Sequence, residues 1–375
     1  MEDISLQSRI DVLTEQQVLI QDSAVAFIAQ DEELKKTRES RFVQPGYDQQ
    51  TWQEMAELGW LGFLIPEQYG GIGLGFDDLH PVLIQLGKGL LPAPFVATAV
   101  VAASVLVNCD NEAIKKDRLP ALVSGAWKPA LAWQETQGQM SVEAEQLRIV
   151  DGKLSGKKAF VPDAGGADDF IVSAGGDKGT ELYLVNKGAT GLTIDYEQRI
   201  DGGFYARLSF DQVDVGELLA GTDRAEQVLE SALDEGRVAA SVELLGVMTR
   251  SLEITVDYLN QRVQFDKPIG SFQAIQHKTV DLFILSEISR SVVLQTIALL
   301  DGDASAHDRA VGASQVKARC GDAALQITKS AIQLHGGIGY TDEANIGLYL
   351  KKAMYLASWL GNATAHRARY AELTL

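Results

Sequence analysis

Arg262 and the glycine pair Gly336-Gly337 are residues whose types could hold a nucleotide diphosphate. A diphosphate needs a fixed cation, which a guanidinium supplies as a planar set of donors, and a backbone that approaches closely. Glycine allows that approach because it lacks a Cβ atom. Phe265 follows Arg262 closely and could pack against an adenine or a ribose. The plain alternatives are a surface ion pair for Arg262 and a helix-ending turn for the glycines.

The histidines and cysteines predict no metal site. His80, His277, His307 and His366 have no ligand spacing with one another or with acidic residues. His335, beside Gly336, is interpreted as a helix-end residue that could contact a bound dinucleotide. The two cysteines, at positions 109 and 320, lack CxxC spacing, which favours a reduced, cytoplasmic protein over a disulfide framework.

Charge and hydropathy exclude several classes of function. The chain has 375 residues, 46% of them hydrophobic, and a formal net charge of -18. Such a chain can bury a large core, while its acidic surface disfavours nucleic acids and anionic lipid. We expect no membrane span, because no uninterrupted apolar run reaches about 18 residues. The acidic N-terminus lacks the features of a secretory signal, which again predicts a cytoplasmic protein.

The elements that would position these residues fall into three zones. We predict an N-terminal helical domain over 1–125, a middle antiparallel β domain over 126–222 and a C-terminal four-helix bundle over 223–375. The middle zone has short apolar runs separated by turn residues, including Asp151-Gly152, which suits a tight hairpin turn. The last zone has helical periodicity over about 223–265, 271–300 and 308–335, and again from 345.

Three segments make the chain resemble the acyl-CoA dehydrogenase family of flavoproteins. They read MAELGWLGFLIPEQYGGIG, QRVQFDKPIGSFQAIQHKTVDL and AIQLHGGIGYTDEANIGLYLKKA, at 55–73, 261–282 and 331–353. Their order and spacing hold from about residue 15 to the C-terminus. The resemblance implies a mainly α fold with a small β domain, and FAD as cofactor. It also implies residues that bind the ADP part of a neighbouring subunit's FAD: Arg262, Phe265, Gln273, Gln333, Gly336 and Gly337.

The sequence departs from this family where the catalytic base would be. Abstraction of the α proton of an acyl thioester requires a carboxylate, which most members place before a Gly-Thr pair near the C-terminus. Here that position is Leu360, in the stretch WLGNAT. Other members carry the base before an arginine on the first bundle helix, where this chain has Gly236. Glu235, one residue earlier, lies about 100° around the helix and is the fallback candidate.

The segments that would contact the flavin ring are also altered. The family's T-E-P-G-A-G-S-D loop here reads WQETQGQMSVEAEQ, which keeps Glu135 but loses the Gly-Ser-Asp part. The family's K-x-W-I-T-N segment reads KAFVPD. Phe160 could still cover a ring face, or it could be an ordinary core residue. Pro162 has neither a hydroxyl nor an N–H group to offer the flavin.

The resemblance therefore predicts a divergent small subunit of a heteromeric (α2β2) acyl-CoA dehydrogenase. Such a chain would support FAD for a homologous catalytic subunit, act on a bulky steroid-side-chain or dicarboxylic acyl-CoA, and pass electrons to electron-transfer flavoprotein. One alternative is a self-sufficient homotetrameric dehydrogenase with Glu235, or else Glu135, as base. Another is a flavin-free acyl-CoA-binding or scaffold protein. An acyl-CoA oxidase would also need a base.

Overall fold

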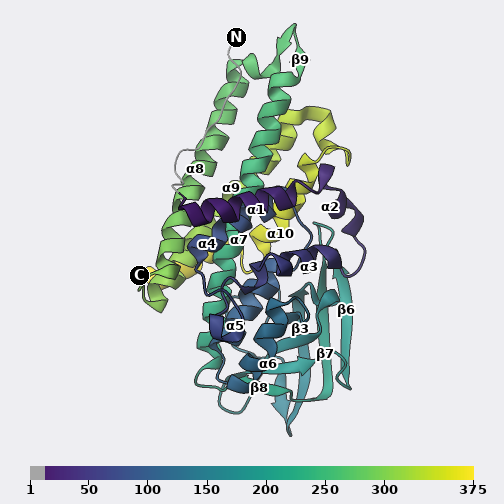
Figure 1. Cartoon of the computed structure of the whole chain (residues 1–375), viewed down its shortest axis with the longest axis vertical. Helices are drawn as coiled ribbons and strands as arrows, with labels where there is room; N and C mark the ends of the chain where they lie inside the picture. Colours follow the sequence, from purple (N-terminus) through teal and green to yellow (C-terminus); the bar gives the residue numbers. More distant parts are fainter. Residues whose placement is uncertain (1–12) are drawn as a thin grey trace. The chain divides into compact units, whose positions relative to one another are not determined.

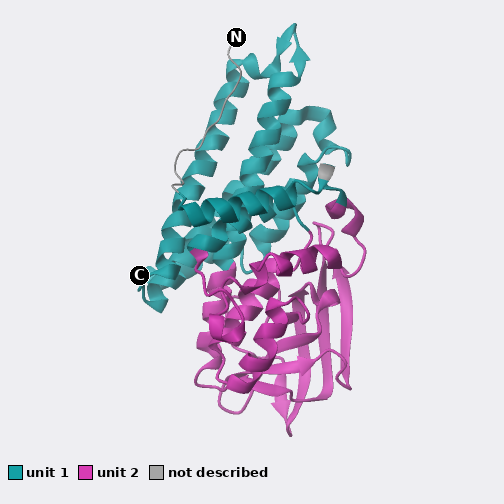
Figure 2. Cartoon of the chain, in the orientation of Figure 1, with its two compact units in different colours: residues 1–35, 77–91, 237–375 teal, residues 36–76, 92–236 magenta. Residues whose placement is uncertain are grey.

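The computed structural model of the chain describes residues 13–375, so the signal-sequence expectation lies largely outside the described residues. The described chain is mostly helical, with one large sheet in its middle and a helix bundle toward its C-terminus (Figure 1). This arrangement confirms the predicted fold class. The chain forms two compact units (Figure 2), one of residues 1–35, 77–91 and 237–375 and one of residues 36–76 and 92–236. These units divide the chain differently from the three predicted zones, which stay a prediction.

Long helices build the first unit. The bundle helices meet the ranges predicted from apolar periodicity within a few residues. Capping residues fix the ends of one of them. Ser305 accepts a hydrogen bond from the backbone of Asp308 at the start of one helix, and Gly336, with φ of 66°, ends the same helix. The helices are α1 (Glu15–Ile28), α4 (Phe76–Gly89), the larger part of α7 (Ala225–Gln261), α8 (Gln273–Asp301), α9 (Ala306–His335), α10 (Ile346–Ser358) and α11 (Ala363–Thr374).

Shorter helices accompany the sheet in the second unit: α2 (Lys35–Ser40), α3 (Gln49–Glu57), the π-helical η4 (Phe95–Ala102), α5 (Ala103–Asn108) and α6 (Glu112–Val123). The strands are β1 (Pro129–Ala132), β2 (Arg148–Val150), β3 (Lys153–Pro162), β4 (Asp169–Gly175), β5 (Thr180–Asn186), β6 (Leu192–Gln198), β7 (Phe204–Asp214) and β8 (Glu217–Ala220). Their order in the sheet is β6-β7-β3-β2-β4-β5-β8, with β1 also paired to β4.

The hairpin between β2 and β3 forms where the sequence predicts it. Val150 pairs with Lys153, and both intervening residues, Asp151 and Gly152, have positive φ. Most strand pairs are antiparallel, as predicted, but β4 lies parallel to β1 and to the end of β2. Every residue of β1 is buried, so this strand lacks the alternation by which a half-exposed strand is recognised.

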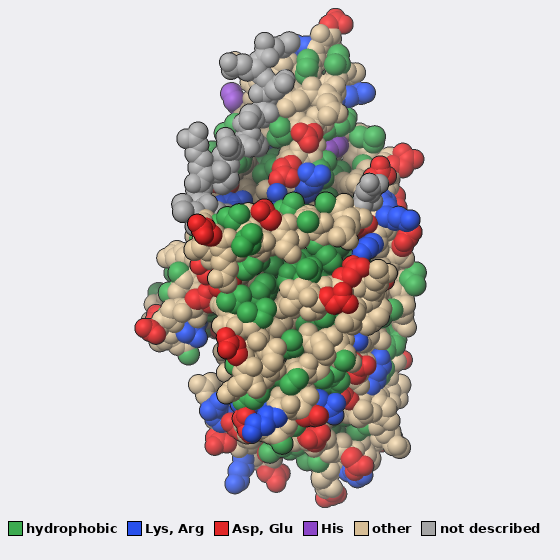
Figure 3. All heavy atoms as spheres, viewed as in Figure 1, with side chains coloured by type: hydrophobic (Ala, Val, Ile, Leu, Met, Phe, Trp, Pro, Cys, Tyr) green, Lys and Arg blue, Asp and Glu red, His purple; other side chains and the backbone are tan. Residues whose placement is uncertain are grey.

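The charge distribution on the surface and the apolar character of α8 relate to two functions that the sequence disfavours, nucleic-acid binding and membrane insertion. Acidic and basic side chains are interspersed on the face shown in Figure 3, without a continuous basic area. Among the described residues, α8 is the one helix long and apolar enough to cross a membrane, a test that bundle helices also pass. Its exposed Val280, Ile284 and Ile288 recur every four residues and form one stripe along the helix.

Candidate cofactor-binding and active site

A short hairpin at the end of α7 carries Arg262 and displays Phe265. Strand β9 (Val263–Gln264) pairs with β10 (Lys267–Pro268), and the turn between them is Phe265-Asp266. Both turn residues have positive φ, 53° and 61°, although neither is glycine. The ring of Phe265 is 86% exposed and packs edge-on against Phe272 at 6.1 Å between ring centroids. A strained turn that holds an apolar ring in solvent is typical of a binding surface.

The glycine turn follows α9 and is open on its outer side. Gly336 has φ of 66° and ψ of -142°, a conformation that glycine adopts freely. A Cβ atom built on Gly336 or Gly337 would meet no atom within 4 Å. Gln333, one turn earlier, and Gln273, the first residue of α8, are also exposed. The predicted ADP-binding residues thus all lie at the surface of the first unit.

A stacked ring pair ties the hairpin to the glycine turn. The His335 imidazole lies on the Tyr258 ring, with 4.5 Å between centroids and 21° between planes. The carbonyl of Tyr258 accepts the backbone N–H of Arg262 at 2.8 Å, and His335 directly precedes Gly336. His335 Nδ1 lies 2.8 Å from the Ala331 carbonyl, so Nδ1 carries the proton there. Burial lowers the pKa of His335, which favours the neutral ring.

The break between α10 and α11 is held rigidly and is apolar. Leu360 has φ of 60°, and its side chain is buried. Lys317 Nζ donates to the carbonyl of Gly361 at 2.8 Å and to that of Ala357 at 3.2 Å. His366 Nε2 lies 2.9 Å from the Leu360 carbonyl, and Asn362 caps α11. The chain keeps this irregular turn with internal donors and offers no carboxylate at Leu360.

Three cationic or basic side chains converge behind this break, and all are fully buried: Arg237, Lys317 and His366. Burial, followed by the charge of Arg237, lowers the pKa of Lys317 to about 7. Burial, with Arg237 and Lys317, lowers the pKa of His366 to about 3. His366 Nδ1 is buried and has no hydrogen-bond partner among the described residues. The local field at Leu360 is therefore suited to a negative charge that Leu360 does not carry.

The second predicted position of a base is also without an acid. Gly236 is buried in α7, immediately before Arg237. Glu235 is half-buried on the same helix. It remains the candidate that the sequence offers as a fallback.

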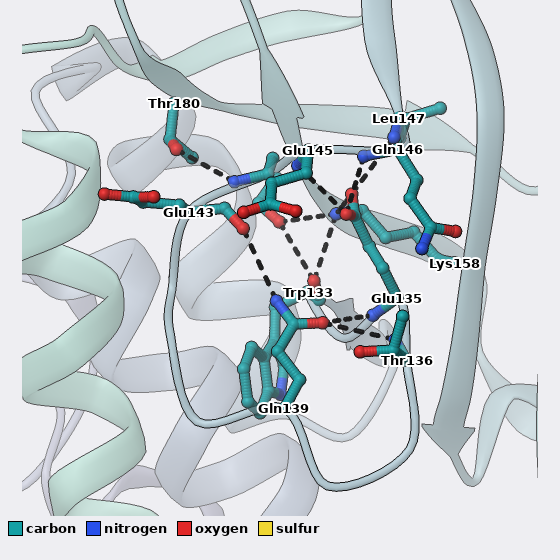
Figure 4. A network of polar contacts seen from close by, with 12 residues as sticks. Trp133, Glu135, Thr136, Gln139, Glu143, Glu145, Gln146, Leu147, Lys158 and Thr180 are labelled. Atoms are coloured by element: carbon teal, nitrogen blue, oxygen red, sulfur yellow. Dashed lines mark hydrogen bonds and ion pairs between the residues drawn. The ribbon is translucent and has the colours of Figure 1, made fainter.

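The carboxylate of Glu135 is buried inside the second unit and bonded to several neighbouring groups (Figure 4). Its carboxylate accepts the backbone N–H groups of Glu145, Gln146 and Leu147 at 2.7–3.0 Å. Lys158 Nζ donates to it at 2.7 Å, and both side chains of this pair are buried. Burial alone would raise the pKa of Glu135, but Lys158 and the backbone donors outweigh it and lower the pKa. These bonds hold the loop of residues 135–147 together. Because its oxygens are already occupied by donors and its pKa is lowered, Glu135 is a poor base.

The strand segment after Lys158 is irregular. The pairing of β3 with β7 shifts between Lys158 and Val161, and Phe160 at this bulge has φ of 54°. Its ring is half-buried and packs edge-on against Tyr205 at 5.9 Å. The side chain of Phe160 is therefore partly accessible, which a residue that covers one face of the flavin ring would need to be. Pro162 pairs with Tyr205 in the ladder.

Comparisons with protein families, with other proteins and with solved structures all point to one family. The family description "Acyl-CoA dehydrogenase, N-terminal domain" matches residues 14–126, and "Acyl-CoA dehydrogenase, C-terminal domain" matches residues 226–374. The mitochondrial isovaleryl-CoA dehydrogenase of Solanum tuberosum is 28% identical over 338 residues, 85% of this chain and 81% of that protein. A solved variant of the "Tcur3481-Tcur3483 steroid ACAD" is 30% identical, with a TM-score of 0.87 over 96% of this chain and 97% of that one. The chain belongs to the acyl-CoA dehydrogenase family.

A further solved structure, the ChsE4-ChsE5 complex from Mycobacterium tuberculosis, has a TM-score of 0.85. The match covers 96% of this chain and 97% of that one, at 24% identity. At this identity the likeness shows the fold alone.

Acyl-CoA dehydrogenases are oxidoreductases that act on acyl-CoA and use FAD, so the residues present can be tested against that cofactor. The ADP end fits the first unit, because the open glycine turn and the exposed Arg262 lie on two segments joined by a ring stack. The ring end does not fit the second unit equally well. There Glu135 is used inside its own loop, and Pro162 has no hydrogen to donate.

Sequence reasoning missed the roles of Lys317, Arg237 and His366. The sequence did offer one signal, Lys317 among the small residues of α9. A helix face of small residues packs closely, so a charged residue on it needs buried partners.

Two basic residues near the C-terminus, Lys352 and Arg369, have partners in the first unit. Lys352 pairs with Glu243 at 2.7 Å, and Arg369 donates to Ser314 at 2.8 Å.

Proposed function

We propose that this chain is a supporting subunit of a heteromeric acyl-CoA dehydrogenase that forms the α,β double bond of an acyl-CoA thioester. The observation that carries the proposal is Leu360, a buried aliphatic residue in a locked turn at the position of the family's base. Gly236 leaves the alternative position without an acid as well. A homologous catalytic subunit would then supply the carboxylate.

The chain's contribution is to hold the ADP part of FAD. Arg262 would meet the diphosphate, the backbone at Gly336 and Gly337 would allow its close approach, and Phe265 would cover the adenosine. Bound FAD supplies the acceptor for the hydride that leaves the β carbon. Because the ring end is not supported here, the ring would lie in the catalytic partner, in an α2β2 assembly.

The identities that we propose for the acyl group and for the electron acceptor rest on resemblance to other acyl-CoA dehydrogenases. The relation to a steroid acyl-CoA dehydrogenase supports a bulky acyl-CoA such as a steroid side chain, and a dicarboxylic acyl-CoA is the second class. Electron-transfer flavoprotein is the acceptor that we propose. We also propose a cytoplasmic location, consistent with two buried free cysteines, Cys109 and Cys320.

Native mass measurement with flavin counting tests this assembly. The full chain is purified alone and after co-expression with a homologous subunit that carries the catalytic glutamate. We expect little flavin and no dehydrogenase activity from the chain alone, and a flavin-containing, active heteromer from the pair. Full activity from a homomeric preparation would contradict the proposal.

The self-sufficient enzyme is the second candidate, because Glu235 is half-buried near Arg237 on α7. In that case Glu235→Gln should reduce the chemical step by orders of magnitude while flavin stays bound. Under our proposal the same change leaves the turnover of the heteromer unaltered. A flavin-free scaffold is distinguished by the visible absorption spectrum of the purified heteromer, which would lack a flavin band.

A further inference from the structure

Two exposed apolar side chains directly follow the glycine turn, and no proposed cofactor contact uses them. They are Ile338 and Tyr340 of the 3-10 helix η7 (Gly336–Tyr340). The side chain of Tyr340 is 85% exposed and that of Ile338 is 49% exposed. A single exposed apolar residue needs no explanation, but a group of them beside a binding surface indicates contact with another molecule.

The packing of Gly339 directs both side chains outward. Gly339 is buried against α9, and a Cβ atom built on it would lie 2.7 Å from the carbonyl oxygen of Ile332. Only a residue without a side chain can approach the helix so closely. Because successive residues of a 3-10 helix are about 120° apart, the neighbours of an inward residue point away from the helix that it contacts. Ile338 and Tyr340 are therefore presented to the outside by the fold itself.

The end of η7 is fixed by its own hydrogen bonds. Thr341 donates to the Ile338 carbonyl twice, through its backbone N–H at 3.0 Å and through its hydroxyl at 2.8 Å. The next residue, Asp342, pairs with Lys351 of α10 at 3.6 Å. A side chain on a backbone that is already ordered loses little conformational freedom when it binds, which favours tight association.

The proposed sharing of one FAD molecule identifies what lies opposite η7, so this step rests on the proposed function. In that arrangement the diphosphate lies on the backbone of Gly336 and Gly337, while the flavin ring lies in the catalytic subunit. At a rise of about 2 Å per residue, Tyr340 is only about 6 Å along η7 from Gly337. The subunit that holds the other end of the same cofactor must therefore come close to Tyr340. Aromatic side chains are enriched in such interfaces, and tyrosine is frequent among the residues that dominate the binding energy.

We propose that Tyr340, with Ile338 beside it, anchors the catalytic acyl-CoA dehydrogenase subunit by direct protein–protein contact. The partner offers an apolar pocket that receives the tyrosine ring, and burial of the ring supplies the free energy of the contact. This contact is distinct from the cofactor contacts of Arg262 and the glycine turn. The assembly is consequently held together by protein surfaces and not only by the shared flavin.

Sedimentation velocity of the full-length pair over a dilution series, with excess FAD, tests the anchor through the dissociation constant of the heteromer. We expect Tyr340→Ala to raise this constant about thirtyfold, the scale of a dominant interface residue. Tyr340→Phe keeps the ring and should restore most of the affinity. Tyr370→Ala is the matched control, because it removes another exposed tyrosine of the first unit, on α11. It should leave the constant unchanged, and circular dichroism of each variant checks that the chain is folded.

A second comparison separates the partner from the cofactor. Arg262→Gln should lower the affinity for flavin and, with excess FAD, leave the dissociation constant of the heteromer unchanged. A loss of subunit affinity in Tyr340→Ala only at limiting FAD would show that the ring contacts the cofactor, and would overturn the proposal. Dissociation of a homo-oligomer of this chain alone by Tyr340→Ala would overturn it in favour of a second copy.

Two outcomes distinguish this proposal from the proposed function on which it rests. An active wild-type heteromer whose dissociation constant is the same in Tyr340→Ala would refute the anchor and leave the proposed function standing. Absence of any heteromer with the wild-type chain would refute both.

Discussion

The imidazole of His335 stacks on the ring of Tyr258 at 4.5 Å and thereby joins the glycine turn after α9 to the arginine hairpin after α7. Residues that are 77 apart in the chain are thus placed to act on one ligand. Replacing His335 by Ala should lower the free energy of unfolding by about 1 kcal/mol, the scale of an aromatic pair. It should also weaken FAD binding by the heteromer. His335→Phe keeps the stack and should restore most of both, as measured by urea denaturation and flavin titration.

Arg262 should act on the cofactor and not on the fold. Its side chain is exposed at the end of α7, so Arg262→Gln should leave the free energy of unfolding unchanged. The loss of a charge-assisted contact to the diphosphate should weaken FAD binding by the heteromer about tenfold. Arg207→Gln, in the sheet unit, removes another exposed arginine and serves as control. Equal flavin affinity in wild type and Arg262→Gln would argue against the assigned surface.

The Glu135–Lys158 pair should be structural. Lys158→Met leaves a buried carboxylate with backbone donors alone and should destabilise the sheet unit by about 3–5 kcal/mol. The double variant Glu135→Gln with Lys158→Met should lose less than the sum of the single changes, because the two groups are coupled. Urea denaturation of the four proteins gives this cycle. Loss of catalysis in Glu135→Gln with unchanged stability would instead favour a catalytic role.

The long helices could be predicted from the sequence because their signals are local, whereas the cofactor-binding residues stay a prediction. Apolar periodicity, a serine cap and a glycine end define α9, and the Asp151-Gly152 turn fixes one strand register. The role of Glu135 could not be predicted in this way. Its partners follow ten to twenty-three residues later, and only the folded loop brings them within hydrogen-bonding distance. Strand β1 was missed for another reason, since its four residues, Pro-Ala-Leu-Ala, are few and include a proline and two alanines, which are weak strand signals.

Acid should destabilise the first unit through His366. Its pKa is about 3 in the folded chain, below the usual value of 6.5, because of burial and the nearby Arg237 and Lys317. The unfolded chain therefore binds the proton first, and the free energy of unfolding falls as pH decreases from about 6.5 to about 3. The slope from this group is at most about 1.4 kcal/mol per pH unit. His366→Gln can still donate to the Leu360 carbonyl but does not titrate, so its stability should depend less on pH. The same pH dependence in both proteins would show that other groups dominate.

Leu360→Glu should restore the acid without restoring the enzyme. Lys317 and Arg237 lie behind the break and would stabilise an ionised carboxylate there, so we expect the variant to fold. The homomeric chain should nevertheless show no acyl-CoA-dependent dye reduction with excess FAD. The reason is that the Glu135 loop stays closed and Pro162 still lacks a donor for the flavin ring. Leu360→Gln, similar in size but uncharged, is the control. Turnover in Leu360→Glu and not in Leu360→Gln would show that only the base had been missing, and that this chain can hold the flavin ring by itself.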